Sequence, residues 1–195
     1  RWPRFATVEM HRNLTLLSIF FVAVHVVTTV ADGYAPVGLL DAIVPFASPY
    51  RPLWLGLGTV AFDLLPALVA TSLLRGFVPP RAWRALHWTA YASWPIALLH
   101  SFGTGSDART GWLGLFALAC AAAVALSVLW RVASANGAPP RLRVGALAAA
   151  LVVPLGILVW AVSGPLQRGW AARAGTPRSF LAPANVASAS VSAVA

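Results

Sequence analysis

The chain has 195 residues, of which 59% are hydrophobic and only 10% charged, and its mean hydropathy is +0.76. A water-soluble domain carries about 25% charged residues to cover its surface. The composition therefore excludes an ordinary soluble domain and predicts an all-α integral membrane protein. Its net charge of +9 comes from 14 arginines and no lysine. Because these arginines lie between long apolar runs, they indicate membrane borders and do not point to a nucleic-acid partner.

Five apolar segments are long enough to cross about 30 Å of hydrocarbon, which takes roughly 20 residues. We expect membrane spans over residues 12–31, 53–74, 82–102, 112–132 and 144–162. The apolar run 37–46 is too short to span and predicts a surface helix or a re-entrant segment. A start at Arg1 without methionine indicates a trimmed chain and leaves a sixth, earlier span open. Residues 1–164 thus form the predicted transmembrane domain, and residues 165–195 a small-residue-rich, partly disordered tail.

Arginines are distributed unevenly between the two sides of the predicted spans. Two loops on one side hold only Arg51 and Arg109. The opposite side holds nine: Arg1, Arg4, Arg12, Arg75, Arg81, Arg84, Arg131, Arg141 and Arg143. Because loops rich in arginine stay in the cytoplasm, the N-terminal flank is expected to be cytoplasmic. Five spans then place the C-terminal tail outside, although that tail carries three arginines of its own.

All four histidines lie on two of the predicted spans. His11 and His25 belong to the first span, and His87 and His100 to the third. An ionisable side chain inside a bilayer is costly, so each is a functional hypothesis by default. Neutral imidazole is a good iron ligand and a common axial ligand of haem. The competing interpretation is that these are structural histidines with satisfied hydrogen bonds.

The spacing of the histidines favours two ligand pairs. His11 and His25 are 14 residues apart, about 21 Å along a helix axis, and His87 and His100 are 13 apart, about 20 Å. With one span between them, the two helices run parallel, so His11 pairs with His87 and His25 with His100. Two such levels would hold two six-coordinate haems stacked across the membrane. Thirteen steps also leave His87 and His100 about 140° apart around an ideal helix. Either Pro95 distorts this helix, or the two haems approach it from different sides.

This pattern is similar to the ferric reductase-like transmembrane domain, the membrane part shared by ferric reductases and NADPH oxidases. The resemblance covers roughly residues 5–132 and is strongest to bacterial, particularly actinobacterial, members. It is carried by four stretches: His11-Arg-Asn-Leu through Ala-Val-His25, Leu86-His87-Trp88 through Leu98-Leu-His100, Tyr50-Arg-Pro-Leu-Trp-Leu-Gly-Leu-Gly, and Arg84-Ala-Leu-His87.

By this resemblance, His11 and His87 would ligate a cytoplasmic-side haem b, and His25 and His100 an outer haem b. The chain would be an oxidoreductase of the bacterial cell membrane, passing electrons from a cytoplasmic or membrane donor to an outer acceptor. It has no GxGxxG after a strand, and the position of the family's flavin and NAD(P)H domain holds only a short loop before another span. A separate flavoprotein dehydrogenase or a quinol would therefore supply the electrons.

Two other functions stay open at this point. The chain could be an electron-transfer membrane subunit that serves a separate oxidoreductase partner. It could also be a non-redox transporter or scaffold, although no paired halves with interrupted helices support that interpretation.

Two arginines are candidate partners of haem propionates, because a guanidinium pairs well with a carboxylate. Arg12 follows His11 directly, and Arg84 lies one turn before His87. The positive-inside rule explains both positions equally well. On the outer side, Arg51 and Arg109 are weaker candidates for the same role.

Three further positions in the second predicted span have alternative interpretations. Asp63, in its middle, is predicted to make a structural hydrogen bond or to serve a proton or quinol path, unless the span is wrongly placed. Gly56 and Gly58 are interpreted as sites of close helix approach and not of ligand contact.

Overall fold

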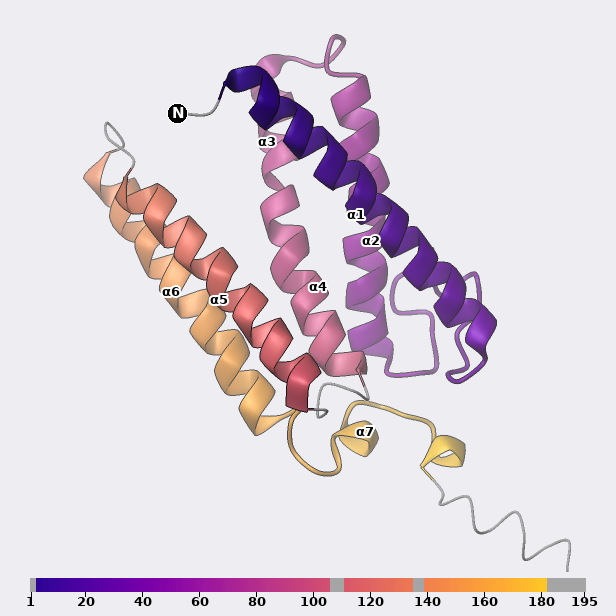
Figure 1. Cartoon of the computed structure of the whole chain (residues 1–195). Coiled ribbons are helices and arrows are strands. Elements are labelled where there is room, and N and C mark those ends of the chain that lie inside the picture. Colours follow the sequence, from indigo (N-terminus) through magenta and orange to yellow (C-terminus); the bar gives the residue numbers. More distant parts are fainter. Residues whose placement is uncertain (1–2, 106–110, 135–138, 182–195) are drawn as a thin grey trace, which may run out of the picture. The chain divides into compact units, whose positions relative to one another are not determined.

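The computed structural model describes residues 3–105, 111–134 and 139–181, and every regular element in these ranges is a helix. This confirms the predicted all-α class. The elements, drawn in Figure 1, are α1 (Arg4–Asp32), α2 (Pro52–Leu73), α3 (Pro80–Trp88), α4 (Ala90–Thr104), α5 (Gly111–Ala133), α6 (Pro140–Ser163), α7 (Trp170–Arg173) and the 3₁₀ helix η2 (Arg178–Phe180).

Among the described residues, four helices are long and apolar enough to cross a membrane, namely α1, α2, α5 and α6. They match the first, second, fourth and fifth predicted spans. Their large apolar side chains are exposed, as at Phe20 (61%), Leu126 (65%) and Val152 (67%), and α1 has no buried residue. Helices that are apolar all round need an apolar environment, so these four fit a membrane protein.

The third predicted span consists of two helices, α3 and α4, that are separated at Thr89. With 9 and 15 residues, neither is long enough to span alone, so the count of five spans stays a prediction. At the break, the Thr89 amide bonds to the Leu86 carbonyl and the Ala92 amide to the Thr89 carbonyl, both at three-residue intervals. Pro95, two turns on, lacks an N–H and crowds the preceding turn, which weakens the helix on its N-terminal side.

The chain divides into two compact units, residues 1–100 with 175–195, and residues 101–174. In the described part of the first unit, α2 packs against α3, and all four histidines lie here. In the second unit, α5 packs against α6. The Trp170 indole of this unit donates a hydrogen bond to the Gly103 carbonyl at 3.0 Å.

Within residues 37–46, positions 39–46 form consecutive turns and a bend, and not the surface helix that was one of the two predictions. The segment contacts α2 at two points. The Thr59 hydroxyl donates to the Asp41 carbonyl at 2.7 Å. Phe46, in a left-handed conformation with φ 65°, places its ring where a Cβ on Gly56 would lie.

Residues 165–181 of the predicted tail contain α7 and η2. The tail over residues 165–195 was predicted to be partly disordered, and its last part, residues 182–195, lies outside the described residues. Arg1 and Arg109, which were used in the orientation argument, also lie outside them.

Candidate functional site

The structure brings the four histidines together as two pairs. The ring centroids of His11 and His87 are 6.2 Å apart, with an angle of 66° between the ring planes. Those of His25 and His100 are 6.4 Å apart, at 76°. Each pair has one histidine from α1 and one from α3 or α4. The earlier histidine of α1, His11, pairs with the earlier partner, His87, and the later one, His25, pairs with His100. The two stretches of helix therefore run in the same direction, as predicted, and Figure 1 shows this course.

The spacing within each pair fits two ligands on opposite sides of one metal ion. A bond from a metal to an imidazole nitrogen is about 2 Å long, and the ring centre lies about 1.1 Å behind that nitrogen, so opposed ligands have centroids about 6.3 Å apart. The observed 6.2 and 6.4 Å agree with this geometry. No group of three or more His, Cys, Asp or Glu side chains among the described residues could hold a bare metal ion. Two histidines suffice for haem, whose iron already has four porphyrin nitrogens, so the donor set fits haem.

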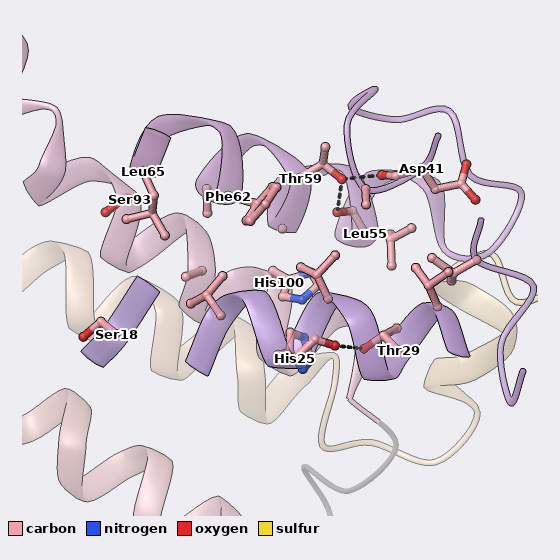
Figure 2. Close-up of a pocket in the computed structure, with 18 of the residues that line it drawn as sticks. Ser18, His25, Thr29, Asp41, Leu55, Thr59, Phe62, Leu65, Ser93 and His100 are labelled. Atoms are coloured by element: carbon pink, nitrogen blue, oxygen red, sulfur yellow. Dashed lines mark hydrogen bonds between the residues drawn. The ribbon is translucent and has the colours of Figure 1, made fainter. Parts of the chain in front are cut away.

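A cavity of about 450 Å³ adjoins the His25–His100 pair, and both histidines line it (Figure 2). Its walls come from α1, α2, α4 and the turns at residues 37–42, and most of the lining is aliphatic or aromatic. A few polar side chains interrupt this lining: Ser18, Thr29, Asp41, Thr59 and Ser93. Cofactor pockets typically measure roughly 300–1,000 Å³ and combine apolar walls with a few polar groups. The cavity is suited to a large, mostly apolar cofactor.

His100 is held by the backbone of α2. Its Nδ1 lies 2.9 Å from the carbonyl oxygen of Trp54. Because a carbonyl can only accept, Nδ1 carries the proton and the lone pair is on Nε2. Histidines that ligate metals almost always donate their other ring N–H to such an acceptor.

Gly58 leaves the space that the His100 ring occupies, since a Cβ at this position would overlap the imidazole. A Cβ on Gly56 would likewise overlap the ring of Phe46. The interpretation of both glycines as sites of close helix approach is therefore corrected. Each accommodates an aromatic ring from another segment, and Gly58 contacts a candidate ligand.

The His11–His87 pair has different surroundings. His11 Nδ1 lies 3.1 Å from the Thr15 hydroxyl, one turn later in α1. The His87 ring stacks on Trp83, also within its own helix, at 4.8 Å and 20°. In the described part of the chain, the buried Nδ1 of His87 and Nε1 of Trp83 have no hydrogen-bond partner.

The two arginines predicted to pair with propionates bond within their own helices. Arg12 lies 3.8 Å from the carboxylate of Glu9, with both side chains exposed, and Arg84 donates to the Pro80 carbonyl at 3.2 Å. Their role toward a cofactor stays a prediction. Arg51 is 5% exposed and donates to the Thr176 hydroxyl at 2.9 Å, so the C-terminal segment engages this guanidinium.

Asp63 is half-buried in α2. Among the described residues, its carboxylate has no hydrogen-bond or ion-pair partner. The structural hydrogen bond that was one interpretation of this residue is not present there.

Sequence reasoning missed the Trp54 carbonyl and the segment 37–46 as parts of the site. The signal for the first was a glycine one turn after Trp54, which leaves that carbonyl uncovered. For the second there was no local signal, because the Thr59–Asp41 hydrogen bond joins residues 18 positions apart. In comparison with known proteins, the chain matches no family model, no curated protein and no solved structure.

Proposed function

We propose that this chain is a dihaem b-type transmembrane electron-transfer protein of the ferric reductase-like kind. The observation that carries the proposal is the presence of two histidine pairs, each with the ring spacing of opposed ligands, 6.2 and 6.4 Å. The repetition of this spacing on two helical stretches that run in the same direction favours ligand pairs over structural histidines.

The separation between the pairs supports a role across a membrane. His11 and His25 are 14 residues apart in one continuous helix, a rise of about 21 Å. The hydrocarbon core of a bilayer is about 30 Å thick. The two pairs therefore lie toward opposite borders of a spanning α1, as two relay points for electrons require.

In this proposal, His11 and His87 hold one haem b, and His25 and His100 hold the other. When bound, haem supplies a one-electron carrier at each pair. The chain's own residues position the ligands and, beside His25 and His100, line the adjoining cavity mostly with apolar side chains. The arginine distribution favours a cytoplasmic side for His11 and His87 and an outer side for the C-terminal tail. The resemblance to the ferric reductase-like family favours a bacterial cell membrane.

The chain acts between two redox partners. A cytoplasmic flavoprotein dehydrogenase or a membrane quinol is oxidised, and an outer acceptor such as a ferric chelate or oxygen is reduced by the same number of electrons. If the acceptor is instead an outer protein, the chain is an electron-transfer subunit of a larger oxidoreductase. Mixing the reduced chain with ferric chelate separates these cases, because rapid oxidation supports direct reductase activity.

The first test is a pyridine haemochrome assay with a reduced-minus-oxidised spectrum of the purified full chain. The proposal predicts two b-type haems per chain with low-spin spectra. One haem would show that one pair does not bind, which contradicts the two-step relay. Well-folded protein without haem, produced with ample haem supply, would overturn the proposal.

A further inference from the structure

We infer that Gly58 is a positioning residue for the His25–His100 pair. Its missing side chain lets the His100 Nδ1–H reach the Trp54 carbonyl, and this hydrogen bond sets the tautomer and orientation of the ring before any cofactor binds. The identity of the cofactor as haem rests on the proposed function, whereas the hydrogen bond and its dependence on Gly58 do not.

Helix geometry explains why a glycine is needed at this position. In an α-helix, side chains point toward the N-terminus, so residue 58 lies over the carbonyl of residue 54. The three atoms nearest to a Cβ built on Gly58 are Nδ1, Cε1 and Cγ of His100, all of them imidazole atoms and all within overlap distance. Any larger residue would therefore compete with the imidazole for the same place beside the carbonyl.

The His100 ring cannot move aside without losing its hydrogen bond. Nδ1 is 2.9 Å from the Trp54 oxygen, which is already an optimal distance. Rotation of the ring would move Nδ1 away from the Trp54 carbonyl. This carbonyl is the acceptor that keeps the proton on Nδ1 and the lone pair on Nε2. Metal–ligand distances tolerate only about 0.2 Å, so a displaced imidazole is a poor ligand.

In the described part of the chain, a hydrogen bond from a ring Nδ1 to a backbone carbonyl is found at the His25–His100 pair and not at the His11–His87 pair. Nδ1 of His87 has no hydrogen-bond partner there, and its ring is held by stacking on Trp83. A substitution at Gly58 should therefore act on the His25–His100 pair and spare the other.

The test is Gly58→Ala in the full chain, with Gly56→Ala as the matched control. Both glycines lie in the first turns of α2, and in both a Cβ would overlap an aromatic ring from another segment, but at Gly56 that ring is Phe46. Gly145→Ala in α6, where a Cβ meets nothing within 4 Å, controls for the substitution itself.

Loss of an outer-shell hydrogen bond to a metal ligand typically weakens binding about 10- to 100-fold. We expect Gly58→Ala to reduce haem affinity at the His25–His100 pair by this factor, measured as faster transfer of one haem per chain to a scavenging protein. Gly145→Ala should leave the rate of this transfer unchanged. Gly56→Ala displaces Phe46 of the segment that lines the cavity, so it should act less than Gly58→Ala and leave the His100 hydrogen bond intact. An unchanged rate of haem transfer together with unchanged spectra in Gly58→Ala would overturn the inference.

A second measurement does not depend on haem. Nitrogen NMR of the histidine rings in the haem-free chain, assigned with His100→Ala, should show His100 with its proton on Nδ1. Gly58→Ala should shift it toward the Nε2–H form. If the wild-type chain binds no haem, the proposed function fails, yet the tautomer still decides the inference. If Gly58→Ala does not fold, the wild-type tautomer still tests the hydrogen bond on which the inference rests, because an Nε2–H ring would overturn it.

Discussion

The two histidine pairs share their ring spacing but differ in what surrounds them. His25 and His100 adjoin a cavity, and a backbone carbonyl orients one ring. His11 and His87 depend on contacts within their own helices, a threonine hydroxyl and a stacked indole. The spacing of a pair decides which group it can bind, whereas its surroundings decide how firmly each ligand is held and tune the bound metal. The same ligand set can thus give two unequal sites.

Removing a whole pair should have the largest effect. His25→Ala with His100→Ala should lower the haem content from two per chain to one, because a haem at this pair would lose both of its protein ligands, whereas His11 and His87 are unchanged. His11→Ala with His87→Ala should also leave one haem, with a different absorption maximum. The measurement is the pyridine haemochrome assay with difference spectra. Retention of two haems in either variant would contradict the assignment of that pair.

The Trp83 indole that stacks on His87 should affect haem binding at the His11–His87 pair and not at the other pair. Stacked aromatic pairs contribute about 0.5–1.5 kcal/mol, so Trp83→Leu should weaken haem binding at His11 and His87 about 2- to 10-fold. Trp83→Phe keeps a ring without the unpartnered N–H and should bind close to wild type. Haem transfer to a scavenging protein measures the rate of loss from each pair. Faster loss from His25 and His100 instead would show that the two sites are not separately supported.

The hydrogen bond between Thr59 and Asp41 should stabilise the cavity wall beside the other pair. Thr59→Val removes the donor at nearly constant volume, and the free energy of unfolding should fall by about 1 kcal/mol. Thr71→Val in the same helix is the matched control, since among the described residues the Thr71 hydroxyl bonds only to carbonyls one turn before it. Thermal unfolding in detergent and the rate of haem loss measure the effect. Equal destabilisation by both substitutions would remove the special role of Thr59.

The arginines near His11 and His87 should have the smallest effect. Arg12→Gln with Arg84→Gln should change the free energy of unfolding by less than about 0.5 kcal/mol, because both side chains are exposed and bond within their own helices. Potentiometric titration provides the check on the propionate hypothesis. A lower midpoint potential of the haem at His11 and His87 would show that one or both guanidinium groups act on it.

Much of the fold followed from composition and periodicity. Spanning helices require long apolar runs, and this property is local, so four of the five predicted spans coincide with helices of spanning length. The third segment differs because of its break at Thr89, whereas the sequence pointed to Pro95 as the distortion. At the break, the three-residue hydrogen bonds tighten the helix, and each tightened residue adds about 20° of rotation, which turns His87 and His100 toward a common side.

The sequence by itself determined the helical class and the register that brings His11 beside His87 and His25 beside His100, because hydropathy and helical rise act along one segment. Only the tertiary structure decided that the Trp54 carbonyl holds His100, that Gly58 leaves room for its ring, and that residues 37–46 form a wall of the cavity. Trp54 and His100 are 46 positions apart, so their contact depends on how two helices pack and not on the residues around either one.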